Sequence, residues 1–515
     1  MTFPTHPLYE AKKQEWQMLE DAFDGESEVK KAGVRYLPPT PAQVLDGMGT
    51  DGCGVPKDGQ IAYDNYLARA VFPDFYTEGV KTLVGIMNEK PAKITVPKQM
   101  EELLGSITTN REDVQTLLRM LHFRLLTTGR AGALVDMPST AAPGKEAMPY
   151  ISLYGALKII NWDDGGTNGG DNKLNMVVLD ESGVKRKDDF SWEKEERYLV
   201  LTLGGIDPNA EVSHDYAMRI GSSATTLGNE ILPQFRGNKL NEIPFVFAGP
   251  VDLDATPDQA PLIGLARICF NLYKSEADYR YTLFMTGQDT LVISGRMPES
   301  TKEIDGSGNE NHVRVGAGAA IMLDANGKAE YIGVSGSGLS EQRQAIEADR
   351  NMAAVRTGQL LAPGKMSMES GEALKTRVAA QTATLASVAI SSAKALEKAL
   401  RFIAKWMQLD ENSVIVEPNL EFSNYKIATQ DLVQLITAKK LGFPISMETL
   451  HSYAKQCGIT DKSFAEEMEK IINDPAHLVA IMQAGGNVEG NNPLNAAGGP
   501  QKKPDEVQPP SNSQL

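Results

Sequence analysis

Cysteine is scarce in this 515-residue chain: Cys53, Cys269 and Cys457 lie far apart, and none belongs to a C-x-x-C pair. This scarcity excludes a disulfide framework and a zinc knuckle, and it predicts three small buried residues in a reducing compartment, the cytoplasm.

The sequence also has no run of about eighteen apolar residues, so no membrane-spanning helix is expected. Its first residues lack an apolar segment, which argues against a secretory signal.

Catalytic and cofactor motifs are missing as well. The six histidines are scattered singly, and there is no G-x-S-x-G nucleophile elbow. Residues 358–366 resemble a phosphate-binding loop, but five residues separate the two glycines and Met366 stands where a magnesium-binding Ser or Thr is needed. His122 lies in an expected helix and is predicted to be packed, not catalytic. The sequence therefore predicts no catalytic residue, no cofactor and no enzyme.

Two groups of carboxylates are the remaining candidates for metal ligands. One consists of Asp163, Asp164 and Asp171, and the other lies in residues 252–258. The second group lacks the glycine and glutamate of an EF-hand calcium loop. We expect solvated turn carboxylates in both groups and no metal site. A metal-dependent hydrolase that uses Asp163, Asp164 and Asp171 is the alternative enzymatic hypothesis.

Basic residues are outnumbered, 51 against 67 acidic ones, which gives a formal net charge of −16. This balance argues against a protein that grips nucleic acid through phosphate contacts. It is compatible with a conduit for DNA, because a negative wall repels phosphates and prevents sticking.

Apolar periodicity predicts an α+β fold that is predominantly helical. Short β-type runs alternate with turn clusters over about residues 149–247, after a short strand at 133–136, and a strand-like run follows residue 412. The tail from about residue 485 has too few apolar residues to fold and is expected to be disordered. Helices are expected at residues 1–21, 61–88, 113–128, 258–286, 339–357, 371–409, 429–441, 446–456 and 461–472.

Several local motifs, in the same order along the chain, resemble the portal proteins of tailed bacteriophages. They are YDNYLARAVFPDFYTEGVKTLVGIMNEKP (63–91), LLTTGRAGALVDMP (125–138), YGALKIINW (154–162), IPFVFAG (243–249), PLIGLARICFNLYKSEADYRYTLFMTGQDTLVISG (261–295) and MESGEALKTR (368–377). Each motif is short, but their common order over about residues 60–475 makes the resemblance specific.

The resemblance implies a ring-forming portal-type fold with wing, stem, clip and crown regions. The expected regions are an N-terminal wing (1–257), a first stem helix (258–285), a clip (286–338), a second stem helix (339–358), a tunnel loop (359–370), a long wing helix (371–409), a crown (410–474) and the disordered tail (485–515).

The resemblance also implies a structural function without catalysis. Such subunits form a ring, expected to be a dodecamer, at one vertex of the capsid, and double-stranded DNA passes through it non-specifically during packaging and ejection. The implied partners are further copies of the chain, the major capsid protein, the terminase large subunit and a head-tail adaptor. The implied location is the virion, with the host cytoplasm during assembly.

Three residues of the implied tunnel loop are candidate site residues. Lys365 is a candidate DNA contact, since a ring of lysines can touch phosphates at a constriction, although a solvated loop lysine is the simpler explanation. Met366 and Met368 are candidates for adaptable packing between subunits, or for filling the core. A monomeric cytoplasmic adaptor with a helical core is the second alternative function.

Overall fold

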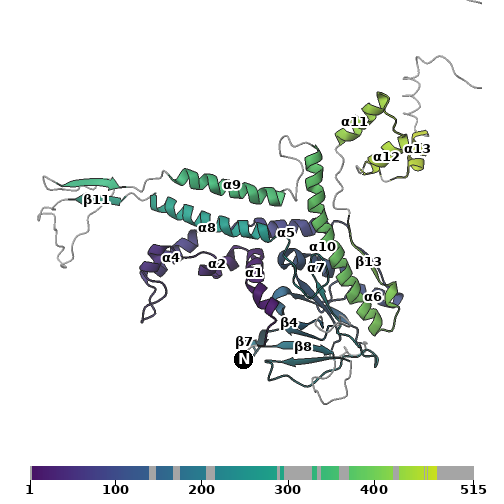
Figure 1. The fold of residues 1–515 in the computed structure, drawn as a ribbon, viewed down its shortest axis with the longest axis horizontal. Coiled ribbons are helices and arrows are strands. Elements are labelled where there is room, and N and C mark those ends of the chain that lie inside the picture. The colour runs from purple at the N-terminus through teal and green to yellow at the C-terminus, as the bar shows by residue number, and fades with distance from the viewer. Residues whose placement is uncertain are drawn as a thin grey trace, which may run out of the picture. The chain divides into compact units, whose positions relative to one another are not determined.

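The computed structural model describes residues 3–138, 147–165, 174–203, 215–286, 290–294, 327–332, 338–358, 371–420, 429–456, 459–460 and 462–472. The chain forms two compact units, Met1–Ser423 and Asn424–Leu515. Helices dominate and several small antiparallel sheets accompany them, so the predicted α+β class is confirmed (Figure 1). No helix in the described ranges is long and apolar enough to cross a membrane.

The first unit begins with a group of helices. A proline at the first turn and the His6 ring, which accepts a hydrogen bond from the Leu8 N–H, start the first of them. Where helical spacing predicts helix over residues 61–88, the structure has two helices, which end and restart around Pro73, a residue without an N–H for the helix ladder. The helices are α1 (Pro7–Asp24), α2 (Glu26–Lys31), α3 (Pro41–Leu45), α4 (Asp58–Arg69), α5 (Phe75–Met87) and α6 (Glu101–Leu104).

Helix α7 (Val114–Thr128) agrees with its prediction at both ends. Asp113 caps its start, accepting a 2.7 Å hydrogen bond from the Thr116 N–H, and Gly129 ends it in the left-handed conformation at φ +71°. The chain then enters β2 (Ala131–Asp136), the central strand of the sheet β10-β2-β3. One turn therefore connects a buried helix to a buried strand.

Antiparallel pairing joins all the strands of the described residues. The sheet-rich region predicted at residues 149–247 is confirmed. The remaining strands are β3 (Tyr150–Gly155), β4 (Ile159–Asp163), β5 (Met176–Asp180), β8 (Tyr198–Leu203) and β9 (Tyr216–Gly221) in the order β4-β5-β8-β9, β10 (Phe245–Ala248), and the pairs β6 (Gly183–Arg186) with β7 (Trp192–Glu195) and β1 (Lys93–Thr95) with β13 (Ile415–Glu417).

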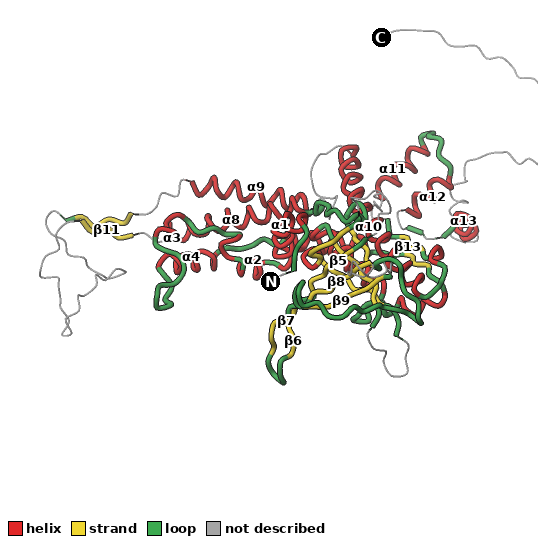
Figure 2. Tube along the Cα trace, turned by 60° about the horizontal axis from the view of Figure 1, so that its bottom comes forward, coloured by secondary structure: helices red, strands yellow, loops and turns green. Residues whose placement is uncertain are grey.

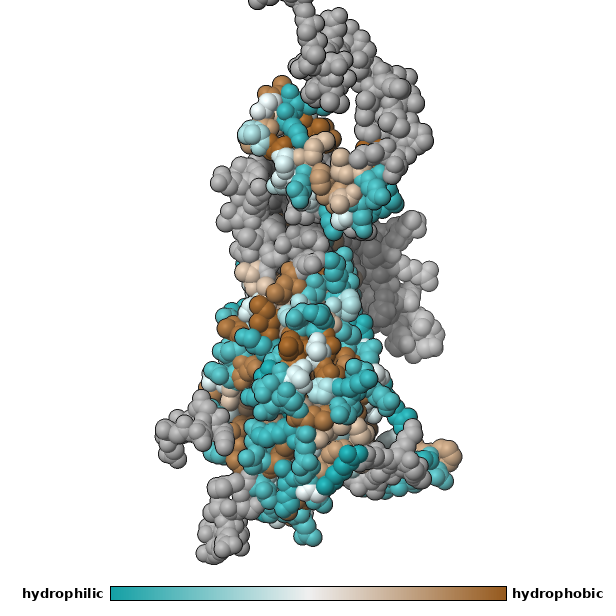
Figure 3. All heavy atoms as spheres, turned by 90° about the vertical axis from the view of Figure 1, so that its right-hand side faces the viewer, coloured by the Kyte–Doolittle hydropathy of each residue, from teal (hydrophilic) through white to brown (hydrophobic). Residues whose placement is uncertain are grey.

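The core of the first unit lies between these sheets and the helices. The 36-residue helix α10 (Gly371–Trp406) contacts α7, β2, β10 and β13. Trp406 at its end is fully buried, and its indole N–H donates a 3.1 Å hydrogen bond to the Asn238 carbonyl. On the face drawn in Figure 3, hydrophobic residues are interspersed with hydrophilic ones and do not gather in one continuous area.

An elongated element, here called the arm, follows β10. It consists of α8 (Ile263–Thr286), the antiparallel pair β11 (Thr290–Ser294) and β12 (Lys328–Ile332), and α9 (Leu339–Gly358). Helices α8 and α9 lie side by side with the β11–β12 pair at their far end (Figures 1 and 2). The predicted helices at 258–286 and 339–357 are thus present, with α8 starting five residues later.

The second unit contains α11 (Thr429–Lys440), α12 (Met447–Gln456) and α13 (Phe464–Ile472), each within two to three residues of its predicted position. Residues 410–420 belong to the first unit, since β13 pairs with β1. The predicted disordered tail, 485–515, lies outside the described residues.

Candidate functional site

The three candidate tunnel-loop residues, Lys365, Met366 and Met368, lie in the segment 359–370, outside the described residues. Their roles therefore stay predictions. The segment is bounded by the last residues of α9 and the first of α10.

Of the three carboxylates in the hydrolase hypothesis, the structure describes Asp163 and Asp164, at the end of β4. Asp163 ends β4, and its side chain accepts hydrogen bonds from the Gly165 N–H at 3.0 Å and from the Asn175 amide at 3.3 Å. Asp164 lines a cavity described below, and Asp171 lies outside the described residues. Across the described ranges no group of three or more His, Cys, Asp or Glu side chains is placed to hold a metal ion.

The carboxylates of residues 252–258 also cap backbone groups. Asp252 accepts from the Asp254 N–H at 3.1 Å, and Asp258 accepts from the Val251 N–H at 3.2 Å. Burial raises the pKa of Asp258 above its usual range. These contacts shape a turn between β10 and α8, as expected of turn carboxylates.

The cysteine prediction is right for one residue and wrong for another. Cys269 on α8 is buried, and burial raises the pKa of its thiol to about 12. Cys53 is exposed, because it lies in a surface turn whose N–H groups at Cys53 and Val55 both donate to the Asp51 carboxylate at 2.8 Å. Cys457 lies outside the described residues.

An ion-pair cluster joins the two helices of the arm. Glu276 of α8 is only 6% exposed, and its carboxylate contacts Arg350 of α9 at 2.5 Å and Arg280, one turn along α8, at 2.9 Å. The two guanidinium groups compensate the charge of the buried Glu276 carboxylate. Because the ion pair with Arg350 requires these two side chains to lie opposite each other, it also fixes how α8 and α9 are aligned along their lengths.

The arm is also tied to α4. The Tyr66 hydroxyl donates a 2.5 Å hydrogen bond to the Asp278 carboxylate, and the Arg69 guanidinium lies 3.9 Å from the Phe284 ring centroid. Burial, followed by the bonded Asp278 carboxylate, raises the pKa of the Tyr66 hydroxyl far above its usual range. Helix α4 therefore supports the half of α8 that lies nearest the β11–β12 pair.

Most of α9 faces away from its own subunit. In the described part of this helix only Ile346 and Ala353 are buried, seven residues apart on one face. Met352 is 48% exposed, and at the end of α8 the side chains of Leu283 and Met285 are 49% and 45% exposed. Most of the surface of α9 is therefore exposed in the described part of the chain.

The G-R-A-G segment after α7 has a structural explanation. A side chain at Gly132 would meet the Phe245 ring at 2.2 Å and Ile159 at 2.9 Å, so only glycine fits between them. Arg130 is 2% exposed and lies 4.4 Å from the Trp162 ring centroid and 4.6 Å from that of Phe247. Residues 129–132 therefore serve the packing of α7 against the sheet β10-β2-β3.

Arg130 is a buried cation with few hydrogen bonds. One guanidinium nitrogen donates to the Ala255 carbonyl at 2.6 Å, while Nε and the other terminal nitrogen have no partner in the described structure. Burial lowers the pKa of Arg130 to about 9, and the Asp258 carboxylate acts in the opposite direction. The charged guanidinium group of Arg130 is stabilised mainly by the faces of the Trp162 and Phe247 rings.

His122 is packed inside α7, as predicted. It is 2% exposed, and the Asn88 side-chain amide lies 3.0 Å from its Nδ1, while Nε2 has no partner in the described residues. Burial lowers its pKa to about 4. The ring is therefore neutral at pH 7.

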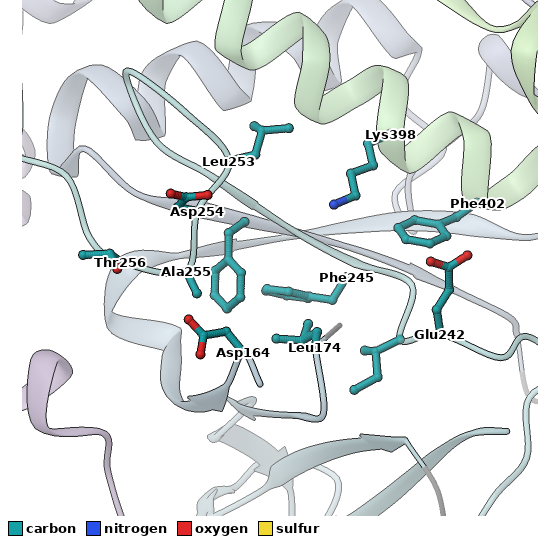
Figure 4. Close-up of a pocket in the computed structure, with 12 residues that line it drawn as sticks. Asp164, Leu174, Glu242, Phe245, Leu253, Asp254, Ala255, Thr256, Lys398 and Phe402 are labelled. Carbon is teal, nitrogen blue, oxygen red and sulfur yellow. The ribbon is translucent and has the colours of Figure 1, made fainter. Parts of the chain in front are cut away.

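A cavity of about 520 Å³ opens beside the end of α10 (Figure 4). Phe245, Phe247 and Phe402 provide aromatic walls, and Asp164, Glu242 and Asp254 provide carboxylates, with Lys398 reaching in from α10. Glu242 already forms an ion pair with Lys405. The Asp254 carboxylate has no hydrogen bond or ion pair within the described residues. The sequence patterns did not reveal this cavity, because its walls come from four separate segments.

Comparison with known proteins gives one family match. Residues 261–407 match the family model described as "Domain of unknown function (DUF4055)". The match begins two residues before α8 and ends one residue after α10, so it covers the arm, the segment 359–370 and the long helix. No curated protein is significantly similar to the chain.

Among solved structures, the chain is similar to subunits of gene transfer agent particles. One comes from the structure described as "Virion of native gene transfer agent (GTA) particle", with 12% identity, 80% of this chain and 97% of that chain covered, and a TM-score of 0.35. Another is from "Neck of native GTA particle computed with C12 symmetry", with 13% identity, 80% and 96% covered, and a TM-score of 0.35. A third is from "Neck of empty GTA particle computed with C6 symmetry", with 12% identity, 74% and 90% covered, and a TM-score of 0.36.

Proposed function

We propose that this chain is a portal subunit: a structural protein that assembles into a homo-oligomeric ring, a dodecamer, at one vertex of a tailed-phage capsid. The observation that carries the proposal is the arm, in which two long helices lie side by side, are joined by an ion pair, and bear a strand pair at their far end. A ring of such arms encloses a channel, and the motifs common to portal proteins fall on and around them.

The exposed surface of α9 supports oligomerisation. A helix buried only at Ile346 and Ala353, with Met352 and the end of α8 exposed, has few apolar contacts for its length. Packing between neighbouring arms would cover these side chains and add the contacts that a single subunit lacks.

Each region of the chain receives a portal role in this proposal. Helices α8 and α9 are the stem, the β11–β12 pair belongs to the clip, and the segment 359–370 is the tunnel loop. The wing consists of residues 1–257 with α10, and the helices α11, α12 and α13 of the second unit fall within the proposed crown, 410–474. The clip is the docking site for the terminase large subunit and later for the head-tail adaptor, and the wing contacts the major capsid protein.

Net charge supports passage of DNA without retention. With 67 acidic and 51 basic residues, the subunit repels the phosphate backbone on average, so duplex DNA moves through non-specifically during packaging and ejection. The protein is then a component of the virion that is present in the host cytoplasm during assembly.

Lys365 is the proposed exception to this repulsion. A ring of lysines at the constriction would touch phosphates as the duplex passes. The variant Lys365→Glu is expected to slow packaging or ejection. Normal packaging and ejection rates in Lys365→Glu particles would remove Lys365 from the proposal.

Light scattering and negative-stain imaging of the purified full-length protein test the portal proposal. A portal gives rings with a central hole and a mass about twelve times the 55.9 kDa of the chain. A monomer near 55.9 kDa under all ionic conditions would contradict the proposal and favour the monomeric adaptor. Catalytic turnover that is lost on chelation would favour the hydrolase instead.

A further inference from the structure

Both strands of the β6–β7 hairpin are exposed to solvent. All eight of its strand residues are exposed, and it projects from the end of the four-stranded sheet (Figure 2). Phe190 at its tip is 95% exposed, Val184 is 68% exposed and Trp192 is 66% exposed. An isolated two-stranded hairpin is marginally stable in water, and one with two exposed aromatic rings is poorly suited to remain uncovered.

The tip of the hairpin is held in one conformation. The Asp188 carboxylate accepts hydrogen bonds from the N–H groups of Phe190 and Ser191 at 3.0 and 2.8 Å, and from the Ser191 hydroxyl at 2.5 Å. The Arg186 guanidinium donates to the carbonyls of Asp188 and Asp189 at 2.9 and 2.7 Å. The exposed Phe190 ring is thus presented on a preorganised loop, which lowers the entropic cost of binding.

The two faces of the hairpin differ in charge. Lys185 pairs with Glu195 at 3.5 Å and Lys187 with Glu193 at 3.9 Å, so the face that carries Lys185 is neutralised within the hairpin. Cross-strand register places four residues together on the other face: Val184, Arg186, Trp192 and Lys194. That face carries the apolar side chains of Val184 and Trp192 and two cations. Arg186 contacts the Asp189 carboxylate at 3.3 Å, whereas the Lys194 ammonium has no hydrogen bond or ion pair within the described structure.

A surface of complementary chemistry lies at the cavity beside α10. The loop at residues 250–256 carries Val251, which is 70% exposed, Leu253 at the cavity wall, and the Asp254 carboxylate. Behind them lie the phenylalanine rings and the other carboxylates of the cavity (Figure 4). An aromatic ring fits against Val251 and Leu253, and an ammonium group fits beside Asp254.

These two surfaces lie at opposite ends of the same strand. Leu174 lines the cavity just before β5 begins, and the hairpin starts three residues after β5 ends at Asp180. A rigid five-residue strand of about 17 Å separates them, so the hairpin cannot fold back into the cavity of its own subunit. Two complementary surfaces at opposite ends of one rigid unit can form a head-to-tail contact between copies, and such contacts build a ring when the rotation between neighbouring copies closes.

We infer that the β6–β7 hairpin of one subunit docks on the 250–256 loop and the adjoining cavity of the next copy of this chain, with Phe190 and Trp192 as apolar anchors and Lys194 paired with Asp254. This inference rests on the proposed ring and specifies one contact that holds neighbouring subunits together. The contact is heterologous: each subunit provides the hairpin to one neighbour and the cavity to the other.

Photo-crosslinking of the full-length protein tests the contact directly. With p-benzoylphenylalanine in place of Phe190, irradiation is expected to give covalent dimers and higher multimers, and mass spectrometry should place the crosslinks in residues 242–256 or 398–402. The same probe in place of Leu45, which is 86% exposed on α3, is the control and should give no crosslink to these residues.

The outcomes separate this inference from the proposed function. Rings whose Phe190 crosslinks map elsewhere, or that give no intersubunit crosslink, overturn the hairpin contact and leave the portal proposal intact. Wild-type protein that stays monomeric overturns both.

Charge variants provide a second test with a matched control. Lys194→Glu and Asp254→Lys are each expected to weaken ring association about tenfold, and the double variant should recover most of the loss. Lys185→Glu, on the opposite face of the same hairpin, should leave association within about twofold of the wild type. Equal effects of Lys194→Glu and Lys185→Glu, or no recovery in the double variant, would overturn the Lys194–Asp254 pairing.

Discussion

Arg350 of α9 contacts the buried carboxylate of Glu276 of α8 at 2.5 Å, across 74 positions of sequence. Arg280 contacts the same carboxylate from within α8, at 2.9 Å. The arm therefore has one ionic connection in its interior, in addition to the apolar contacts of Ile346 and Ala353.

The first prediction concerns this connection. Arg350→Ala leaves Glu276 buried with one cation and is expected to destabilise the α8–α9 pair by about 1–3 kcal/mol. Hydrogen exchange in α9 measures the effect. Arg343→Ala, which breaks an exposed pair with Glu347 on the same helix, is the control and should change stability by less than about 0.5 kcal/mol. Equal exchange in the two variants would show that the Glu276 cluster does not hold the arm.

The second prediction concerns Gly132. Gly132→Ala places a methyl group against Phe245 and Ile159, and we expect a loss of about 1–3 kcal/mol in the free energy of unfolding. Phe245→Leu should recover part of this loss in the double variant. Gly85→Ala, at an exposed position of α5 with nothing within 4 Å, is the control and should stabilise the helix by roughly 0.5–1 kcal/mol. Denaturant unfolding measures the free energy of unfolding of the three variants. An unchanged free energy for Gly132→Ala would contradict the prediction.

The third prediction concerns the pH dependence contributed by His122. Its pKa is about 4 in the folded chain and 6.5 in the unfolded chain, so the unfolded chain binds more protons between these values. His122 therefore costs no stability above pH 6.5 and roughly 3 kcal/mol once the pH has fallen to about 4. The difference in unfolding midpoint between wild type and His122→Gln should change over this window. A constant difference between pH 7 and pH 4.5 would contradict the prediction.

The fourth prediction concerns Arg130. Lysine lacks the planar group that stacks between Trp162 and Phe247, so Arg130→Lys is expected to lose about 2–4 kcal/mol of stability while keeping a buried charge. Arg130→Met removes the charge at similar length and should lose less than Arg130→Lys. Thermal unfolding of both variants is the measurement, and the reverse order would mean that the charge itself stabilises this junction.

Local signals explain which elements could be predicted from sequence. Helix α7 has a capping aspartate, an apolar stripe and a terminal Gly129, and both of its ends were predicted correctly. Helix α9 ends where the glycine at 358 breaks the pattern. The apolar spacing continues across Pro73, which separates α4 from α5, so the spacing alone predicts one helix where the structure has two.

Contacts between residues far apart in the sequence could not be predicted from such local signals. Nothing near Glu276 shows that its partner is Arg350, and nothing near Cys53 shows that Asp51 holds it in an exposed turn. The hairpin at residues 183–195 has no alternation of apolar and polar residues, because none of it is buried within the subunit. The alternation of apolar and polar residues in a strand arises because one of its faces is buried in the core of the same chain. A strand that is not buried in that core therefore has no such alternation, and its sequence does not predict it.

The pairing of β1 with β13 has a consequence for synthesis of the chain. Lys93 and Glu417, which face each other in this pair, are 324 positions apart. The ribosome has therefore made most of the polypeptide before the edge strand near the N-terminus meets its partner. A truncated chain that ends before residue 415 leaves that edge unpaired and open to pairing with another chain, so an aborted product is expected to aggregate more readily than the full-length one.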